Sequence, residues 1–278
     1  MKMIKNLLLI VAFLFFFSCS SDDSTPQNRV SNISTEQGNK NSNTVIVYMQ
    51  GGPDYTLDPI DNLIEGSNTQ DVLWVNVHQI QTSKPELFQS ADITFDEAKE
   101  YASTNASNVD NVVKYYKEKG KKVYLVSVSY GSFVAADYVA RFGVSDIEKA
   151  LLLVGRLDMD EDLWKTFSVG NEGIFLYDLE GNVSITTENV TSIPDRNKNK
   201  LAAALGYKRY TQLWKDVSGL NKIAFVWGSK DERTGRLTES ELEFIESKNI
   251  GVFKIEEATH NEAALEGLIN LNNLFDIN

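Results

Sequence analysis

Three residues of this 278-residue chain could together turn a hydroxyl group into a nucleophile: Ser129, Asp231 and His260. Serine reacts poorly unless a base removes its proton, and a histidine that a carboxylate orients and balances is suited to that task. The chain has only two histidines, which restricts the choice of base. These residue types, in the order serine, aspartate, histidine, indicate nucleophilic acyl transfer.

Ser129 lies where a buried-strand pattern changes into a helical one. The segment 123–132 reads V-Y-L-V-S-V-S-Y-G-S, and apolar residues at helical spacing follow it. A serine on such a sharp strand-to-helix turn needs small residues two positions to either side, because larger ones would strike the adjoining strand or helix. Ser127 and Gly131 satisfy this requirement.

The candidate acid and base also follow predicted strands. Asp231 comes after the apolar run 222–227, and His260 comes after the run 252–255 and begins a helical pattern. The carboxyl ends of parallel strands share one edge of a sheet, so residues distant in sequence can converge there. Asp158, just beyond the run 149–154, is a rival for the acid, and we favour Asp231.

Backbone N–H groups for the oxyanion of such a reaction are predicted at two places. The N–H of Tyr130, directly after the nucleophile, is one donor. Gly51 and Gly52, which follow the short strand 44–49, supply the second in a glycine-rich loop.

The elements that must position these residues alternate between strands and helices, which predicts an α/β fold with a mostly parallel sheet and helices on both faces. Thr94 with Glu97, and Thr238 with Glu241, are spaced as capping boxes at helix starts. Periodicity weakens over about 156–220, which we interpret as a cap insertion over the sheet.

Two motifs carry a resemblance to a known family. Ser127-x-Ser129-x-Gly131 resembles the nucleophile elbow of the α/β-hydrolase fold, with serine in place of the usual first glycine. Gln50-Gly51-Gly52-Pro53-Asp54 resembles the His-Gly-Gly-Pro-Gly loop of proline-iminopeptidase-like hydrolases.

The resemblance implies a serine hydrolase for esters or, less readily, amides or peptides, with a small-molecule or short peptide acyl substrate and no cofactor. Ser129, His260 and Asp231 would form the triad, and Gly51, Gly52 and Tyr130 the oxyanion hole. The alternative is a catalytically inactive, hydrolase-like surface lipoprotein that binds a ligand or partner.

The amino-terminal residues are typical of an exported, lipid-anchored protein. Lysines precede an apolar run at 7–17 that is too short to span a bilayer, and Cys19 follows it. We therefore expect a lipoprotein signal peptide at 1–18, lipidation of Cys19, a disordered tether at 19–43 and the domain at 44–278. This places the protein in the bacterial cell envelope, at the outer membrane or cell surface, with a retained membrane anchor as the alternative.

Composition excludes several other functions. The net charge of -12 argues against binding to nucleic acid or anionic lipid, since both need clustered Lys and Arg, so any membrane contact would come through the lipid anchor. Cys19 is the single cysteine, which excludes an internal disulfide and a cysteine-based metal site. Asp158, Asp160 and Asp162 imitate the start of a calcium loop, but Leu163 and Val169 stand where its glycine and glutamate belong, so we predict no metal.

Two further sets of residues allow more than one interpretation. His78, at the end of a predicted strand, could line a pocket, although we favour a structural role. Aromatic residues of the cap could line an apolar substrate site or pack the cap onto the sheet: Trp164, Phe167, Phe175, Tyr177, Tyr207, Tyr210 and Trp214.

Overall fold

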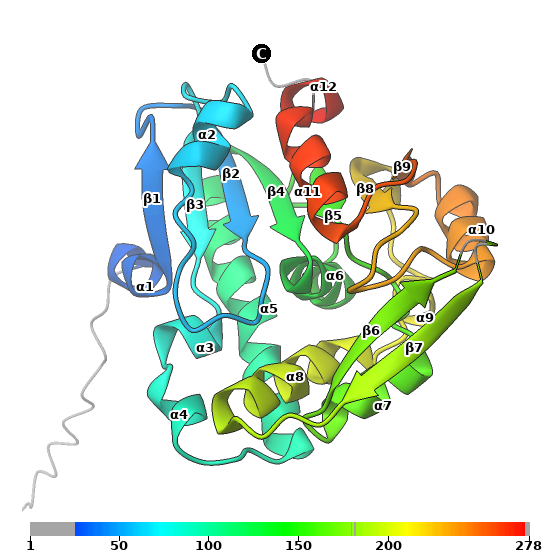
Figure 1. The fold of residues 1–278 in the computed structure, drawn as a ribbon. Helices are drawn as coiled ribbons and strands as arrows, with labels where there is room; N and C mark the ends of the chain where they lie inside the picture. Colours follow the sequence, from blue (N-terminus) through cyan, green and yellow to red (C-terminus); the bar gives the residue numbers. More distant parts are fainter. Residues whose placement is uncertain (1–25, 179, 181, 276–278) are drawn as a thin grey trace, which may run out of the picture.

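In the computed structural model, which describes residues 26–178, 180 and 182–275, seven strands form one sheet (Figure 1). Their order is β1-β3-β2-β4-β5-β8-β9, and every neighbouring pair is parallel except β1 with β3. The strands are β1 Ser34–Gly38, β2 Thr44–Met49, β3 Leu73–Val77, β4 Lys122–Val128, β5 Ala150–Leu153, β8 Ile223–Gly228 and β9 Gly251–Ile255. This confirms the predicted α/β fold with a mostly parallel sheet.

Helices cover both faces of the sheet, so its central strands are apolar on both sides. Buried residues of α5 Phe95–Glu118, α6 Tyr130–Phe142 and α10 Glu239–Ser247 pack on one face, together with Val30 of α1 Pro26–Ile33. Those of α11 His260–Ile269 and α12 Leu271–Phe275 pack on the other, beside α2 Asp61–Gly66. Two short helices, α3 Ile80–Ser83 and α4 Glu86–Gln89, precede α5.

Capping boxes fix the starts of three helices. Both boxes predicted from the sequence are present, at Thr94 for α5 and at Thr238 for α10. A third, at Thr259 with Glu262, begins α11 and so sets the position of His260 at its first residue.

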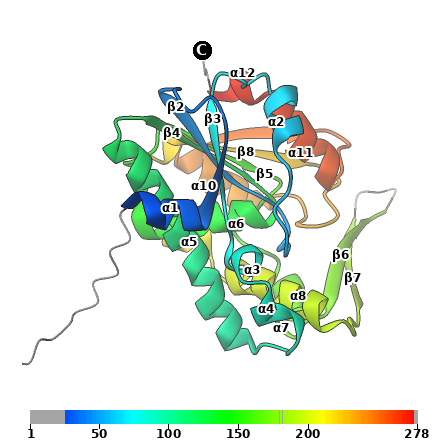
Figure 2. The same ribbon diagram turned by 90° about the vertical axis from the view of Figure 1, so that its left-hand side faces the viewer.

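The cap consists of the elements between β5 and β8. They are α7 Glu161–Ser168, β6 Glu172–Tyr177, β7 Val183–Glu188, α8 Ile193–Gly206 and α9 Tyr210–Leu213, and a single 3₁₀ turn at Leu220–Lys222 leads into β8. Strands β6 and β7 form a separate antiparallel hairpin. Figures 1 and 2 show this hairpin and α8 lying beyond the end of the sheet toward which β2 and β4 point.

The predicted boundary between tether and domain is wrong for residues 26–43. Strand β1 pairs with β3, and the phenol of Tyr116 donates to Glu36 at 2.5 Å. Backbone hydrogen bonds need no apolar side chains, so a polar sequence can still form an edge strand. The domain therefore includes α1 and β1 and begins before Thr44.

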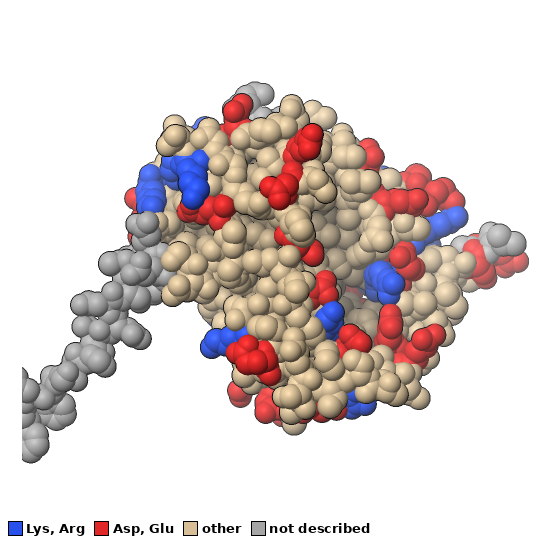
Figure 3. Space-filling model, turned by 60° about the vertical axis from the view of Figure 1, so that its left-hand side comes forward, with Lys and Arg blue, Asp and Glu red and all other residues tan. Residues whose placement is uncertain are grey.

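The predicted signal peptide at 1–18 and the lipidation site Cys19 lie outside the described residues. Within the described part of the chain, no helix combines the length and apolar character that crossing a membrane requires. On the face shown in Figure 3, basic side chains are scattered among acidic ones.

Candidate active site

Ser129 lies on a tight turn between β4 and α6, as its sequence context predicts. Its backbone has φ 52° and ψ -117°, a region that residues other than glycine rarely adopt. The Ser129 N–H donates to the carbonyl of Leu153 at 2.8 Å, which ties the turn to β5. A Cβ atom at Gly131 would lie 2.2 Å from the carbonyl oxygen of Met49, so this position has no room for a side chain.

Ser127 occupies the place of the usual first glycine without disturbing the turn. Its hydroxyl is fully buried and lies 3.2 Å from the carbonyl oxygen of Leu151 and 3.3 Å from the hydroxyl of Ser132. A buried polar group is tolerated when it is hydrogen-bonded. The departure from the family motif is thus accommodated locally.

Asp231 and His260 form a buried hydrogen-bonded pair. His260 Nδ1 lies 2.8 Å from Asp231 Oδ2, and the two residues are 6% and 0% exposed. The other carboxylate oxygen, Asp231 Oδ1, accepts the N–H groups of Arg233 and Thr234, each at 2.9 Å. A carboxylate held in this way fixes the orientation of the imidazole and leaves Nε2 to act on a substrate or nucleophile.

The rival acid, Asp158, faces a different partner. Its two carboxylate oxygens accept the backbone N–H of Thr211 at 3.2 Å and the hydroxyl of Thr211 at 2.6 Å. The structure therefore brings Asp231 to His260 and uses Asp158 to secure α9.

The glycine-rich loop after β2 lies directly beside Ser129. Strands β2 and β4 are neighbours, and a Cβ atom at Gly51 would lie 3.5 Å from Ser129 Cβ. Gly52 has φ +119°, and a side chain there would clash with the N–H of Asp54 at 2.2 Å. Among the described residues, no acceptor is hydrogen-bonded to the N–H of Gly51, Gly52 or Tyr130; Gly52 and Tyr130 line the cavity beside Ser129, whereas Gly51 does not line it.

Gln50, which stands where the His-Gly-Gly-Pro-Gly loop has histidine, makes hydrogen bonds within this loop. Its buried side chain donates to the carbonyl of Thr56 at 2.8 Å and accepts the N–H of Asp58 at 2.9 Å. Its own carbonyl accepts from the side chain of Gln79 at 2.8 Å. The substitution thus keeps the loop ordered through amide hydrogen bonds.

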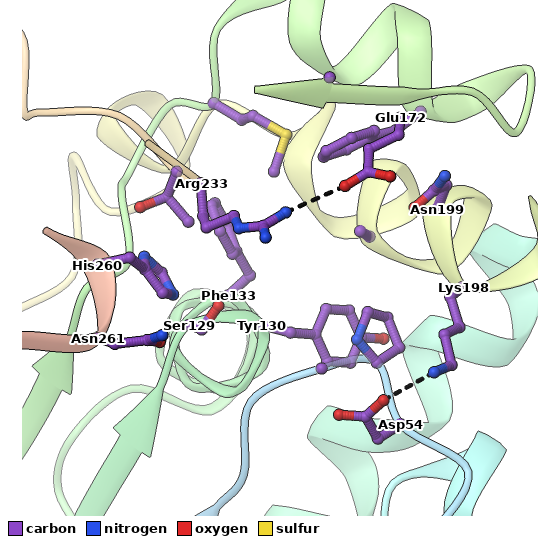
Figure 4. A pocket seen from close by; sticks show the side chains of 17 residues that line it. Asp54, Ser129, Tyr130, Phe133, Glu172, Lys198, Asn199, Arg233, His260 and Asn261 are labelled. Carbon is purple, nitrogen blue, oxygen red and sulfur yellow. Dashed lines mark hydrogen bonds and ion pairs between the residues drawn. The ribbon is translucent and has the colours of Figure 1, made fainter. Parts of the chain in front are cut away.

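A cavity of about 480 Å³ joins these groups (Figure 4). Its lining includes Gly52, Ser129, Tyr130 and His260. Figure 4 shows the side chains of His260 and Ser129 near each other at the cavity wall. In the described part of the chain, no hydrogen bond yet joins the Ser129 hydroxyl to His260. Such bonds are often long in unliganded enzymes and tighten when substrate binds.

The cavity walls combine apolar and charged side chains. Phe133, Met159 and Phe167 contribute apolar surface. Two ion pairs join the core loops to the cap at the wall: Asp54 with Lys198 at 2.8 Å, and Arg233 with Glu172 at 3.0 Å (Figure 4). Of the cap aromatics, Phe167 alone lines this cavity, whereas Tyr210 and Trp214 are fully buried against α6.

Two residues beside the Asp231–His260 pair were not predicted to lie there, although Tyr177 was among the aromatic residues of the cap that could line a substrate site. The carboxylate of Glu232 accepts the backbone N–H of His260 at 3.1 Å, and the phenol of Tyr177 donates to the carbonyl of Asp231 at 2.8 Å. Glu232 could have been suspected from its place beside Asp231. Tyr177 comes from the cap, 54 positions away, and only the fold brings it to the site.

His78 has a structural role, as favoured from the sequence. Its Nε2 lies 2.8 Å from the hydroxyl of Thr35 on β1, and burial lowers the pKa of its imidazole. Within the described residues, no group of three or more His, Cys, Asp or Glu side chains could hold a metal ion.

Comparison with known proteins identifies the fold. No protein-family model matches the chain, and no curated protein matches it. Among solved structures, a hydrolase from Oleispira antarctica, olei00960, has 10% identity and a TM-score of 0.57, with 91% of this chain and 98% of that chain covered. Est1E from Butyrivibrio proteoclasticus has 14% identity and a TM-score of 0.52, with 88% and 94% covered, and has also been solved with ferulic acid bound.

A third similar structure is MGS-M2, an α/β hydrolase enzyme from a Medee basin deep-sea metagenome library. It has 11% identity and a TM-score of 0.53, with 87% of this chain and 93% of that chain covered. The chain therefore has the α/β-hydrolase fold. At these identities the likeness extends to the fold and leaves activity to be argued from the site.

Proposed function

We propose that this protein is a serine hydrolase that cleaves esters and, less readily, amide or peptide bonds. The observation that carries the proposal is the buried hydrogen bond between Asp231 and His260, because His260 lines the same cavity as Ser129. Ser129 lies on the strained turn that the α/β-hydrolase nucleophile requires. The hydrolases among the structurally similar proteins support this assignment.

Acylation begins when His260 Nε2 removes the proton from the Ser129 hydroxyl and the oxygen attacks the substrate carbonyl carbon. The carbonyl oxygen becomes an oxyanion, which accepts hydrogen bonds from the N–H groups of Gly52 and Tyr130, with Gly51 as a further donor. The protonated His260, stabilised by Asp231, then gives its proton to the leaving alcohol or amine. The bond to the leaving group breaks, and Ser129 carries the acyl group.

Deacylation repeats these steps with water. His260 removes a proton from water, the hydroxide attacks the acyl carbon, and the proton returns to Ser129 as the acid is released. Asp231 holds the same imidazole tautomer throughout, because its Oδ2 accepts from Nδ1. No metal or organic cofactor enters this sequence of steps.

The cavity favours a small acyl substrate. A volume of about 480 Å³ lies in the range of pockets for small molecules. Its apolar side chains suit an apolar or aromatic acyl group, and a structure of Est1E holds ferulic acid. We therefore propose short or aromatic esters as the first substrates to test.

Replacement of the nucleophile tests the proposal. Ser129→Ala should lower kcat for p-nitrophenyl esters by at least about a thousandfold, because no other serine among the described residues lines the cavity. Ser247→Ala is the matched control, since this exposed hydroxyl donates to the carbonyl of Phe244 on α10 at 2.7 Å and does not line the cavity. Ester turnover that survives in Ser129→Ala would refute the assignment.

Ligand binding without turnover is the second candidate, and one observation favours it: in the described part of the chain, Ser129 makes no hydrogen bond to His260. This candidate predicts that the wild-type protein binds aromatic esters and returns them unchanged. Turnover by the wild-type protein that depends on Ser129 excludes it.

The expectation of a lipid anchor stays a proposal from the sequence. Cells expressing the full chain should incorporate labelled fatty acid at Cys19, and Cys19→Ser should release the protein from the membrane fraction. A Cys19→Ser variant that stays membrane-bound would support the retained membrane anchor instead.

A further inference from the structure

We propose that the last residue of β5 and the three residues after it, 153–156, together with Thr234 and Glu241, form a positioning network that holds Ser129 and Asp231 in their relative places. The inference rests on the proposed function, in which those two residues must act on one substrate. Strand β5 lies between β4, which leads to Ser129, and β8, which leads to Asp231. Its carboxyl end is therefore the shared neighbour of both.

On one side, the network contacts the nucleophile turn. The carbonyl of Leu153 accepts the N–H of Ser129 at 2.8 Å and the hydroxyl of Ser132 at 2.9 Å. Gly155 packs so closely that a Cβ atom there would lie 2.3 Å from Ser132 Cβ. The first turn of α6 thus rests directly on the end of β5.

On the other side, Thr234 connects the end of β5 to the acid. Its N–H donates to Asp231 Oδ1 at 2.9 Å, and its hydroxyl lies 3.0 Å from both Asp231 Oδ2 and the carbonyl oxygen of Val154. Thr234 is buried, with 6% of its surface exposed. One side chain therefore positions the carboxylate against the strand that also positions Ser129.

The strained backbone of Val154 is further support for a positioning role of the hydrogen bond between Val154 and Thr234. Val154 has φ 47°, a conformation that is costly for a β-branched residue and persists only where surrounding contacts impose it. Its N–H donates to the carbonyl of Val226 at 2.8 Å, and its carbonyl faces the hydroxyl of Thr234. These contacts turn the chain so that Arg156 can reach the carbonyl of Thr234.

A buried ion pair between Arg156 and Glu241 holds the backbone of Thr234 through a hydrogen bond from Arg156. Arg156 Nη2 lies 2.9 Å from Glu241 Oε2, and Arg156 Nη1 donates to the carbonyl of Thr234 at 3.4 Å. Arg156 and Glu241 are 5% and 0% exposed. Buried charges are costly unless they are paired and hydrogen-bonded, so loss of either partner would leave the other as an unpaired buried charge.

Glu241 also holds the chain directly after Arg156. Its Oε1 accepts the N–H groups of Leu157 at 3.0 Å and Asp158 at 2.9 Å. The same carboxylate completes the capping box of α10. Hydrogen bonds thus run from Glu241 through Arg156 and Thr234 to Asp231 and His260.

Thr234→Val and Thr234→Ser form a matched test, because valine keeps the shape of threonine and serine keeps its hydroxyl. We expect Thr234→Val to lower kcat about tenfold with KM within about twofold, as for loss of a hydrogen bond to a charged group. Thr234→Ser should restore kcat to within about threefold of wild type. A Thr234→Val variant with wild-type kcat would overturn the proposal.

A spectroscopic signature in the resting protein separates this inference from the proposed function. The deshielded NMR resonance of the His260 Nδ1–H proton should shift or broaden in Thr234→Val and not in Thr234→Ser. This measurement needs no turnover, so a wild-type protein that cleaves no ester refutes the function while the resonance still tests the positioning. An unchanged resonance in Thr234→Val overturns the positioning role.

The buried pair requires a variant that removes both charges together, because removal of one leaves the other unpaired. In Arg156→Met/Glu241→Gln, glutamine can still complete a capping box, and methionine fills the apolar volume of the arginine stem. The folded double variant should show lower kcat with KM retained and the same change in the His260 resonance. A folded double variant with wild-type kcat and resonance would remove Arg156 and Glu241 from the network.

Discussion

The core loops and the cap line the same cavity, but different interactions hold them. In the core loops, buried hydrogen bonds position the side chains: Asp231 is fully buried and makes four such contacts, and Gln50 ties down the glycine-rich loop. At the cavity wall the cap meets these loops through ion pairs between partly exposed side chains, besides two hydrogen bonds, from the Tyr177 phenol to the carbonyl of Asp231 and from the N–H of Phe175 to the carbonyl of Glu232. Arg233 and Glu172, for example, are 55% and 47% exposed.

This difference suggests that the core loops and the cap have different roles in catalysis. Buried, fully hydrogen-bonded groups keep their geometry, and catalysis depends on geometry held to within fractions of an ångström. Exposed ion pairs contribute little to stability and can exchange partners with a ligand or water. We therefore expect changes in the core loops to lower kcat, and changes at the cap to act mainly on KM.

The largest effect is expected for Asp231→Asn. An amide cannot stabilise the imidazolium and favours the wrong tautomer of His260, which in Ser-His-Asp enzymes lowers kcat by roughly 10⁴-fold. Asp158→Asn is the matched control, because Asp158 binds Thr211 instead, and it should keep kcat within about threefold. The reverse ranking, measured with one ester, would make Asp158 the acid.

Gly131→Ala should disrupt the nucleophile turn. Its Cβ would meet the carbonyl oxygen of Met49 at 2.2 Å, and forced overpacking costs about 1–3 kcal/mol or more. We expect a melting temperature lower by several degrees and a strongly reduced kcat. Gly66→Ala, where nothing lies within 4 Å of the new Cβ, should leave both unchanged. Equal behaviour of the two variants would contradict the tight elbow.

At the cap, Glu172→Gln should raise KM about threefold and keep kcat within about twofold, because Arg233 loses its partner at the cavity wall. Glu161→Gln is the control. It breaks an exposed ion pair within α7, between Glu161 and Lys165 at 2.6 Å, and neither residue lines the cavity. A Glu172→Gln variant with a much lower kcat and an unchanged KM would contradict the proposal that the cap acts mainly on KM.

The smallest effect is a pH-dependent one at the base of the cap. Partial burial raises the pKa of Asp92, but hydrogen bonds from Lys200 and Arg196 of α8 outweigh this and lower the pKa below its ordinary value. The stabilisation is thus present above the unfolded pKa of about 4 and is lost as pH falls through the lower folded pKa. Asp92→Asn should melt below wild type at pH 7, and the gap should close as the pH falls below the unfolded pKa and through the lower folded pKa of Asp92.

A gap in melting temperature that stays constant with pH would show that Asp92 contributes by packing alone. Arg196→Gln is a useful companion, because it removes one of the two cations and should reproduce part of the effect.

The sequence predicted the meeting of the candidate site residues better than the limits of the domain. Ser129, Asp231 and His260 each follow an apolar strand, so their meeting at one sheet edge follows from parallel topology. Strand β1 was missed because its side chains are polar and its stability comes from backbone pairing with β3. The role of Glu241 was only half predicted: the capping box is local, whereas its pairing with Arg156 joins positions 85 residues apart.

Active-site labelling tests the central claim most directly. The protein is incubated with a fluorophosphonate, which reacts readily with an activated serine, and the modified residue is mapped by peptide mass spectrometry. We expect one modification, on Ser129, that disappears in Ser129→Ala and forms much more slowly in Asp231→Asn. Labelling of another residue, or a wild-type protein that does not react, would contradict this claim.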